Sequence, residues 1–420
     1  MRLRIGIVGG SIAGCSAAII LSRAGHDVSV FERSRGGLVG RGGGIATTSA
    51  IFEELVSRDI VDSSMPQFRA KDMPFIVRTA EEPETGRRPY AIGLDLRLFH
   101  WTELWGQLRR RVPDGLYHQG VAVASAEAID GEAVELAFEG GERERFDLVL
   151  FADGYQSVGR QRVSPESELV YRGYMLWRGL LPESAVEDAP LGNDIPRLSY
   201  AHAKGNATAY FVSSAEGSTR AGERAINWAC YIPLPRDEVV AFMVDREGIP
   251  HQGSLPAGSI RPQEEARLKA LMAENLPRWY GDMIKRTEET AVQLIYTSRL
   301  SAYAAGRMCV IGDAGVVAPP FTGSGVFKGY QNVNGLLEEL QMGGGLEAAL
   351  GRWSDEQVRL GERLLALGDQ MEQAFIWDSI DLTDADNETV ADWWKSAVTF
   401  PEDFTYEARK RPAQSPPRSW

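Results

Sequence analysis

The sequence has few residues of the kinds that build metal sites or disulfides. Its 420 residues include three cysteines and five histidines. Cys15, Cys230 and Cys309 lie in apolar stretches and outside any Cys-x-x-Cys motif, which indicates small buried thiols and argues against a dithiol redox centre. The histidines are scattered without zinc-ligand spacing, so we expect no metal site.

The chain also has fewer basic than acidic residues, and it has no clear membrane segment. Against 58 acidic residues stand 45 basic ones, a formal net charge of −13, which argues against nucleic-acid or anionic-membrane binding. Residues 5–22 are uncharged and could mimic a signal or membrane segment, but glycines and serines interrupt them where a turn needs them. With 44% hydrophobic and 25% charged residues, we expect a cytoplasmic globular protein of two or three domains.

The most informative stretch is residues 4–32. Its pattern predicts a strand, a glycine turn, a helix and a second strand that ends in Glu32. Such a unit binds an adenine dinucleotide, because the backbone approaches the pyrophosphate at the helix N-terminus and the acid accepts from a ribose hydroxyl. Ser11 stands where the usual fingerprint has its second glycine. Alone, the stretch does not distinguish FAD from NAD.

Two later apolar strands also end in acids. Residues 147–151 run into Asp153 and Gly154, at a strand end where α/β sheets bind ligands, although an Asp-Gly pair is also a common turn. Residues 308–313 end at Asp313 and lead through two prolines and a Gly-Ser-Gly segment into a helix predicted for 326–341. The N-terminus of that helix offers free amides to an anion; a plain turn with an N-cap is the alternative.

From about residue 165 short alternating strands predict a β-rich insertion, with a hairpin turn at 204–206. Alternation places its aromatic side chains on both faces, so they either fill a sheet core or floor an apolar pocket for a flat ligand. Elsewhere, residues 97–111 predict a helix that begins at Arg97. The glycine-rich loop 33–45 predicts a close approach to a cofactor, with Arg33 or Arg41 facing phosphate or ribose; a mobile surface loop is the alternative.

Three motifs now stand together: GGSIAG (9–14) with Glu32, ADGYQSVGR (152–160) and GDAGVVAPPFTGSGVFKG (312–329). In this order they resemble the group A FAD-dependent aromatic monooxygenases of the 4-hydroxybenzoate hydroxylase fold. The segments YRGYMLWRGLL (171–181), NWACY (227–231) and VQLIY (292–296) resemble the 2,6-dihydroxypyridine 3-hydroxylase branch.

The resemblance implies an α/β fold, with a Rossmann-type FAD-binding domain, an inserted β-rich substrate domain and a C-terminal helical region. We expect the FAD-binding domain at 1–70, 96–165 and 297–365, and the substrate domain at 71–95 and 166–296. The helical region would cover 366–409, before a disordered tail at 410–420.

The resemblance also implies a set of residues that hold FAD. The turn at 9–14 would hold the pyrophosphate, Glu32 the ribose and Asp313 the ribityl chain, while Asp153 and Gly154 would also contact NAD(P)H. The expected cofactor-binding residues are Gly9, Ser11, Ile12, Ala13, Gly14, Glu32, Arg33, Arg41, Arg97, Val121, Asp153, Gly154, Asp313, Pro320, Gly323, Gly325 and Val326.

The chemistry implied is hydroxylation of a small electron-rich aromatic or heteroaromatic molecule. NADPH or NADH would reduce FAD, and O₂ would give a flavin C4a-hydroperoxide that oxygenates the ring. Many relatives have histidine where this chain has Val316, so we expect no proton-transfer group at that site, which argues against a histidine-dependent mechanism. The candidate catalytic residues are Arg178, as an anchor for an anion or carbonyl, and His202 and Tyr210 for proton transfer. Candidate substrate contacts are Trp177, Trp228, Tyr231, Tyr296, Pro320 and Phe321.

Other interpretations stay open at this point. The same fold supports epoxidation, Baeyer–Villiger oxidation, halogenation or reduction, although Cys230 replaces a tryptophan of the halogenase signature. A non-catalytic flavin-binding protein and a plain NAD dehydrogenase are further rivals, and the motif at 312–329 argues against the dehydrogenase. We expect a monomer or homodimer.

Overall fold

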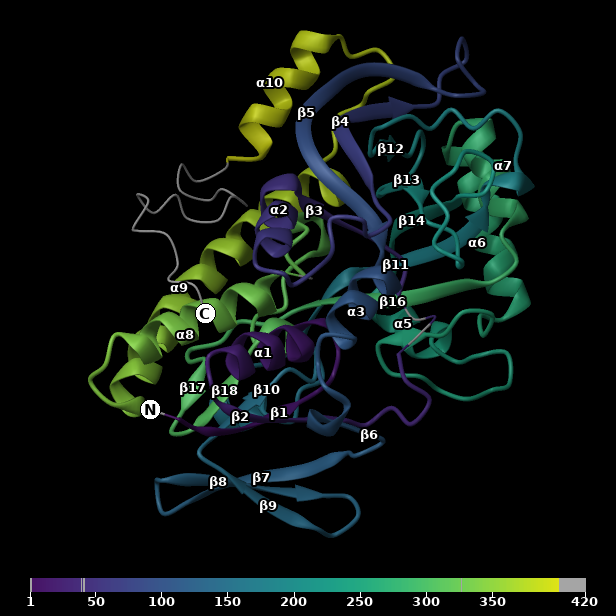
Figure 1. Cartoon of the computed structure of the whole chain (residues 1–420). Coiled ribbons are helices and arrows are strands. Elements are labelled where there is room, and N and C mark those ends of the chain that lie inside the picture. Colours follow the sequence, from purple (N-terminus) through teal and green to yellow (C-terminus); the bar gives the residue numbers. More distant parts are fainter. Residues whose placement is uncertain (1, 39, 41, 326, 400–420) are drawn as a thin grey trace.

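The computed structural model describes residues 2–38, 40, 42–325 and 327–399, so Arg41, Val326 and the tail at 410–420 lie outside it. Three sheets form the frame of the molecule (Figure 1). A six-stranded sheet lies between a nine-stranded sheet above it and a three-stranded sheet below it in that view.

The six-stranded sheet is the dinucleotide-binding unit that the first residues predict. Its order is β17-β18-β10-β1-β2-β6, and β1 pairs in parallel with both β2 and β10. The helix α1 (Ile12–Arg23) connects β1 to β2, as in a Rossmann-type unit. The strands are β1 (Arg4–Val8), β2 (Asp27–Glu32), β6 (Tyr117–Gln119), β10 (Leu148–Phe151), β17 (Ala304–Ala305) and β18 (Met308–Val310).

The nine-stranded sheet combines strands from the first hundred residues with the β-rich insertion. Its order is β15-β16-β11-β14-β13-β12-β4-β5-β3. The strands are β3 (Gly44–Thr48), β4 (Phe68–Val77), β5 (Arg87–His100), β11 (Val170–Pro182), β12 (Arg197–Ser199), β13 (Asn206–Val212), β14 (Ala225–Pro233), β15 (Ser254–Leu255) and β16 (Thr290–Thr297). The division into domains stays a prediction, and the structure pairs β3 and the end of β5 with this sheet.

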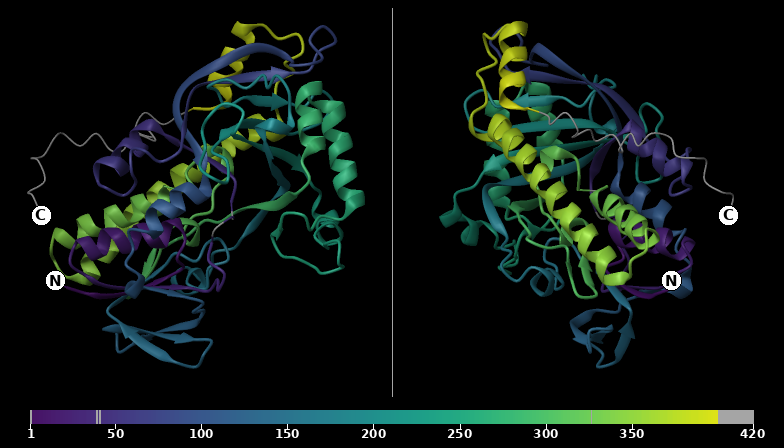
Figure 2. Two further views of the ribbon diagram at one scale, coloured as in Figure 1. Left: turned by 45° about the vertical axis from the view of Figure 1, so that its right-hand side comes forward. Right: turned by 90° about the vertical axis from the view of Figure 1, so that its left-hand side faces the viewer.

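The two faces of the nine-stranded sheet carry different cores. One face packs against α6 (Pro262–Asn275) and α7 (Arg278–Arg286). The other packs against the long helix α9 (Leu346–Glu372), the π-helical turn η5 (Gln373–Trp377) and α10 (Asn387–Ala397). Figure 2 shows α6 and α7 on the side away from α9. We call the face that packs against α6 and α7 the outer face. The inner face packs against the C-terminal helices and also contacts Phe321 of the predicted FAD-binding loop.

The remaining elements connect these layers. The helix α8 (Lys328–Gln341) packs against both α1 and α9. The other helices and turns are α2 (Ser49–Ser57), α3 (Trp101–Arg109), α4 (Arg160–Val163), α5 (Arg236–Phe242), η1 (Asp114–Leu116), η2 (Glu183–Ala185), η3 (Gly312–Ala314) and η4 (Pro320–Thr322). The three-stranded sheet consists of β7 (Val123–Ile129), β8 (Ala133–Phe138) and β9 (Arg143–Phe146).

The predicted helix at 97–111 begins later than expected. Arg97 lies in β5, which pairs with β4 as far as Leu98 and with β3 as far as His100. The helix α3 begins at the next residue, Trp101. Pairing with two neighbours keeps these residues extended although their apolar spacing suits a helix. His100 then caps the helix, since its Nδ1 accepts a hydrogen bond from the backbone N–H of Thr102 at 3.2 Å.

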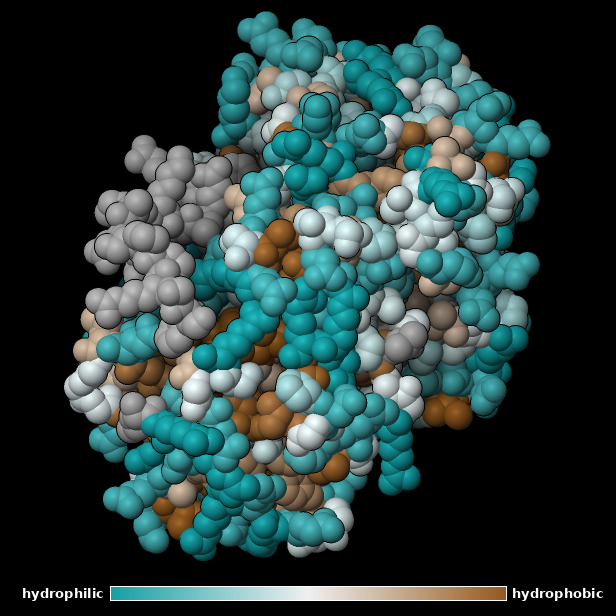
Figure 3. All heavy atoms as spheres, viewed as in Figure 1, coloured by the Kyte–Doolittle hydropathy of each residue, from teal (hydrophilic) through white to brown (hydrophobic). Residues whose placement is uncertain are grey.

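The surface is largely polar. On the face drawn in Figure 3, hydrophilic residues predominate and interrupt the apolar ones. The most exposed large apolar side chains, Val240 at 80% and Met342 at 70%, lie on separate elements. None of the helices in the described part of the chain has both the length and the apolar character needed to cross a membrane.

Trp177 and Trp228 are core residues, which corrects their assignment as substrate contacts. Both side chains are fully buried, and the rings meet edge to face with centroids 4.9 Å apart on the face that packs against α6 and α7. The indole N–H of Trp228 donates to Thr287 Oγ1 at 2.9 Å. Strand alternation is the reason, because Trp177 points away from the face that carries its neighbour Arg178.

We predict that Trp228→Leu lowers the free energy of unfolding by about 3 kcal/mol, since it leaves a cavity and removes the hydrogen bond to Thr287 Oγ1. Urea unfolding measures this effect, and Val240→Ala at an exposed position is the matched control, with a change within about 0.5 kcal/mol. Unchanged stability combined with loss of ligand binding would show that Trp228 contacts the substrate after all.

Candidate active site

Three acids meet at one edge of the six-stranded sheet. Glu32 ends β2, Asp153 follows β10 and Asp313 follows β18, and these parallel strands have their carboxyl ends at the same edge. This edge is where open α/β sheets bind ligands. The structure therefore brings together the three motifs that lie far apart in the sequence.

Two helix N-termini converge at the same edge. The first turn of α1 packs against η3 and α8, because a Cβ placed on Gly329 would lie 2.5 Å from the Ala13 Cβ and one on Gly312 would lie 3.0 Å from it. Neither α1 nor α8 has a side-chain N-cap hydrogen bond or an acid in its first turn. The free amides and positive dipole ends fit the pyrophosphate of a dinucleotide such as FAD.

The turn before α1 and the first turn of this helix pack closely on neighbouring residues only because three of their positions are glycines. Gly9 has a φ of 102°, which side chains rarely adopt. A Cβ on Gly14 would lie 1.8 Å from the Gly9 carbonyl oxygen, and one on Gly10 would lie 2.3 Å from the Tyr117 hydroxyl. Ser11 is the N-cap of α1, so its departure from the fingerprint does not disturb the turn.

Glu32 is positioned by backbone amides. Its carboxylate is buried, and it accepts hydrogen bonds from the N–H of Gly10 and of Ser34, each at 2.8 Å. Val121 lies beside it, since the Val121 N–H donates to the Glu32 carbonyl at 3.0 Å. The carboxylate and Val121 thus stand where the ribose and adenine are expected, and these roles stay predictions.

Of the two described arginines predicted near the phosphates, one faces solvent and the other contacts α2. Arg33 is exposed. The Arg97 guanidinium is directed at α2, where it donates to Ser49 Oγ at 3.0 Å and pairs with Glu53 at 3.5 Å. Their contact with FAD stays a prediction.

Asp153 is tied into its turn by one oxygen only. Oδ2 accepts a hydrogen bond from the Val158 N–H at 2.9 Å, whereas Oδ1 is buried and has no partner among the described residues. Burial raises the pKa of this carboxyl group. An unpaired buried acceptor here fits a ligand that brings a donor.

A buried lysine, which sequence reasoning missed, neutralises Asp313. Lys328 Nζ lies 2.5 Å from Asp313 Oδ1 and donates to the Val316 carbonyl at 2.6 Å. The Arg160 guanidinium holds the same turn from the other side through the carbonyl oxygens of Asp313 and Ala314. The signal in the sequence was a lysine shortly after the Gly-Ser-Gly segment, at the first residue of α8.

Arg178, Tyr210 and Tyr231 lie on the inner face of the nine-stranded sheet. Arg178 interacts electrostatically with both tyrosine hydroxyls, and among the described residues no carboxylate pairs with it. Burial lowers the pKa of the Arg178 guanidinium and raises the pKa of Tyr210 and Tyr231. Tyr210 therefore stays a neutral phenol and acts as a hydrogen-bonding group rather than as a base near neutral pH.

The glycine-rich loop reaches this inner face. The Gly44 N–H donates to Asn227 Oδ1 at 2.6 Å, and a Cβ on Gly43 would lie 2.8 Å from Arg178 Nη1. The loop was expected to approach a cofactor, and its described end packs on the candidate substrate residues. Asn227 was missed because nothing local in the sequence marks it, and only the β13–β14 register brings it beside Tyr210.

The loop that carries Pro320 and Phe321 closes the inner face. Phe321 is buried, with its ring centroid 4.6 Å from that of Tyr231 and 6.3 Å from that of Tyr174. Pro320 is partly buried at the start of η4, and Gly323 ends it with a φ of 64°. Gly323 and Gly325 are exposed, so this loop lies between solvent and the candidate substrate residues.

Two predicted residues lie elsewhere. His202 is exposed, and its backbone N–H donates to Asn275 at the end of α6, on the outer face, so the structure does not support its role in proton transfer. The reason is that β12 ends at Ser199, so the six residues 200–205 loop out where a tight hairpin was predicted. Tyr296 stacks on Tyr155 with centroids 6.2 Å apart, away from Arg178.

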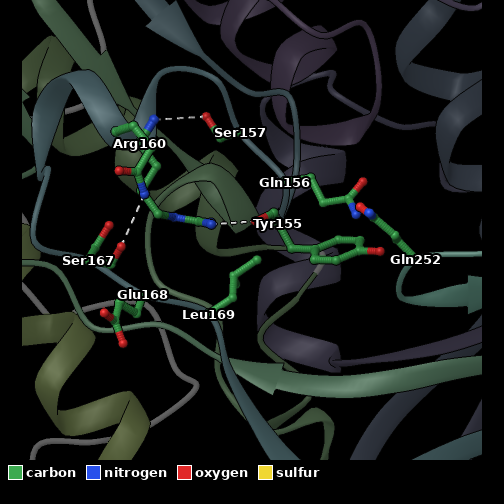
Figure 4. Close-up of a pocket in the computed structure, with 9 residues that line it drawn as sticks. Tyr155, Gln156, Ser157, Arg160, Ser167, Glu168, Leu169 and Gln252 are labelled. Carbon is green, nitrogen blue, oxygen red and sulfur yellow. Dashed lines mark hydrogen bonds between the residues drawn. The ribbon is translucent and has the colours of Figure 1, made fainter. Parts of the chain in front are cut away.

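An open pocket of about 700 Å³ lies beside the Asp153 turn (Figure 4). Polar side chains from three segments line it, among them Tyr155, Arg160, Glu168 and Gln252. The Arg160 guanidinium also donates to the Tyr155 carbonyl, which Figure 4 marks. Residues of the turn that follows Asp153 at the dinucleotide edge therefore also line this pocket.

Comparison with known proteins agrees with this geometry. A model described as FAD binding domain-like matches residues 171–297, and one described as NAD(P)-binding Rossmann-like domain matches residues 7–51. The 2,6-dihydroxypyridine 3-monooxygenase of Paenarthrobacter nicotinovorans is 27% identical over 366 residues, which cover 86% of this chain and 89% of the relative. Over most of its length the chain is similar to FAD-dependent aromatic monooxygenases, as its three motifs indicated.

A second relative and a solved structure extend this comparison, the structure for the fold alone. The 3-amino-4-hydroxybenzoate 2-monooxygenase of Streptomyces cremeus is 28% identical over 347 residues, covering 80% of this chain and 78% of the relative. The solved structure of 2,6-dihydroxypyridine-3-hydroxylase from Arthrobacter nicotinovorans matches with a TM-score of 0.82 at 24% identity, covering 91% of this chain and 95% of that one. The family and the α/β fold with a Rossmann-type domain, as inferred from the sequence, are confirmed.

We predict that Glu32→Gln weakens FAD binding at least about tenfold, because the amide cannot accept from Gly10, Ser34 and a ribose hydroxyl as a carboxylate does. Equilibrium dialysis of the apoprotein against FAD measures the affinity. Glu135→Gln, which removes an acid paired with Arg143 on the three-stranded sheet, is the control with unchanged affinity. Equal FAD affinity of the wild type and Glu32→Gln would refute the ribose role.

Proposed function

We propose that this monooxygenase uses NADPH or NADH and O₂ to hydroxylate a small, electron-rich hydroxyaromatic or hydroxyheteroaromatic ring. The observation that supports this most is the inner sheet face, where Arg178, Tyr210 and Tyr231 surround the small side chain of Ala229 next to Phe321. A flat ring needs such a small-residue floor with polar groups at its edge.

The register of the strands supports this arrangement. Ala229 of β14 lies opposite Arg178 of β11 on one side and opposite Thr208 of β13 on the other. Tyr231 and Asn227 are the next residues of β14 on the same face. Three neighbouring strands thus supply a compact set of polar groups around one alanine.

Each residue has a distinct role in the proposed reaction. Arg178 holds the ionised hydroxyl of the ring, because a cation without a carboxylate partner stabilises an adjacent oxyanion. Tyr210 and Tyr231 remain protonated and hydrogen-bond the ring substituents. Phe321 covers the ring and keeps water out. When bound at the edge of the six-stranded sheet, FAD supplies the redox and oxygen chemistry.

The reactions that name the two relatives support the same class of substrate. One acts on a dihydroxypyridine and another on an amino-hydroxybenzoate, and both rings are hydroxylated and electron-rich. At this level of identity they support the class of substrate and not one compound.

The nicotinamide co-substrate is proposed to dock at the open pocket beside Asp153. Tyr155 lines this pocket and is already stacked on Tyr296, and the electrostatic influence of Arg33 reaches Tyr155. The stacked tyrosine rings would pack against the nicotinamide ring, and Arg33 would attract the phosphates of a reversibly bound dinucleotide.

We predict that the purified protein is yellow and releases FAD on denaturation. Hydroxyaromatic compounds should raise the rate of NADPH or NADH oxidation, and mass spectrometry should find one oxygen atom from ¹⁸O₂ in the product. The panel comprises phenols, hydroxypyridines and hydroxybenzoates. A colourless protein, or NAD(P)H oxidation that no ring compound stimulates and that yields only peroxide, would contradict the proposal; an epoxide, ester or halogenated product would redirect it to the corresponding chemistry.

A further inference from the structure

Arg197 of β12 is a buried cation without a counter-ion. Its side chain belongs to a residue that is only 8% exposed, and among the described residues no carboxylate pairs with it. Its Nε contacts the sulfur of Met73 at 3.4 Å. The guanidinium lies over the rings of Phe375, at 4.8 Å from the centroid, and Phe321, at 5.7 Å.

Apart from Arg178 on the same sheet face, other arginines held within the described structure have acid or carbonyl partners. Arg111 pairs with Asp59 and Asp62, Arg172 with Glu372, and Arg224 with Glu183. Arg160, which is buried, donates to four backbone carbonyl oxygens. Among these arginines of the described residues, the lack of both an acid and a carbonyl partner is therefore specific to the sheet face that carries Arg178 and Arg197.

The two aromatic rings do not replace an anion. A cation–π contact stabilises a guanidinium by less than the free energy that its removal from water costs. Burial accordingly lowers the pKa of the Arg197 guanidinium. The rings fix the position of the guanidinium, and its charge remains available to a ligand.

Strand register aligns Arg197 with the proposed substrate face. Arg178, Ala229 and Thr208 lie opposite one another on β11, β14 and β13. The β12–β13 pairs are Leu198 with Ala207 and Ser199 with Asn206, and continuing this register by one residue brings Arg197 opposite Thr208. Two cations therefore flank a short floor of small side chains.

The polar atoms along this row are also incompletely bonded. Thr208 Oγ1 and the nearby Asn206 Oδ1 are buried without hydrogen-bond partners in the described structure. Tyr210 and Tyr231 interact electrostatically with both Arg178 and Arg197. Buried groups of this kind are normally satisfied, and the polar groups of a ligand on this face would satisfy them.

The π-helical turn η5 holds Phe375 against Arg197. Asn206 Nδ2 donates to the Phe375 carbonyl at 3.2 Å. One residue before the turn, the buried Glu372 binds the Arg172 guanidinium and accepts from the Tyr174 hydroxyl at 3.1 Å. The C-terminal segment is thereby anchored to the sheet at the point where it orients the unpaired guanidinium.

We propose that Arg197 binds an anionic substituent, of the carboxylate class, at the end of the substrate ring opposite the hydroxyl that Arg178 holds. This inference rests on the proposed function, because it assigns the ring to the same sheet face. It narrows the substrate from hydroxyaromatic compounds in general to those that carry a second, acidic group.

Matched acid and amide probes test the proposal. The holoenzyme is titrated with 4-hydroxybenzoate and 4-hydroxybenzamide, and with 6-hydroxynicotinate and 6-hydroxynicotinamide. The dissociation constants come from the perturbation of the FAD absorption spectrum. We expect the wild type to prefer the acid of at least one pair about tenfold or more, Arg197→Met to lose that preference, and Arg197→Lys to keep most of it.

Arg224→Met is the matched control. Arg224 also lies over an aromatic ring of the same sheet, 3.5 Å from the Phe211 centroid, but Glu183 already neutralises it. Its replacement should leave the acid preference unchanged. FAD content and thermal unfolding of every variant report whether the fold is intact.

The outcomes separate this inference from the proposed function. An acid preference that survives in Arg197→Met, or a wild type that binds no acid more tightly than its amide, overturns the role of Arg197. If neutral phenols are hydroxylated without such a preference, the proposed function stands and the inference fails. If the acids bind through Arg197 but yield no oxygenated product, the inference stands and the proposed hydroxylation fails.

Discussion

The contact between the first turn of α1 and the start of α8 is the constraint on which the rest of the site depends. Ala13 can lie against Gly312 and Gly329 only because neither glycine carries a Cβ. This close approach brings two uncapped helix N-termini to one edge of the six-stranded sheet, although the helices lie near opposite ends of the chain. The same approach sets the position of the Pro320–Phe321 loop, which precedes α8 and covers the inner face of the second sheet.

The interior of this acidic protein is organised around cations. Arg160 and Lys328 hold the turn after β18, and Arg178 and Arg197 flank the candidate substrate floor. The first pair is satisfied by carbonyl oxygens and Asp313, whereas the second pair has no acid among the described residues. Although the net charge is −13, no carboxylate among the described residues pairs with the two arginines that flank the proposed site of an anionic ring.

The sequence was sufficient for features that local pattern determines. The strand, turn and helix at 4–32 and the acids after three strands are encoded by neighbouring residues, and the structure reproduces them. Features set by strand pairing were missed. Arg97 stays extended because β5 pairs with β3 and β4, and Arg197 and Asn227 reach the inner face only through the register of β12 to β14. Alternation alone would have shown that Trp177 and Arg178 cannot share a face.

The central claim is that one dinucleotide spans the edge formed by α1 and α8. A crystal structure of the yellow holoenzyme tests it most directly. We predict electron density for FAD that runs from Glu32, across the N-terminus of α1, to a flavin ring beside Pro320 and Phe321. Density for the dinucleotide elsewhere, or a flavin ring that does not reach the Phe321 loop, would contradict the account.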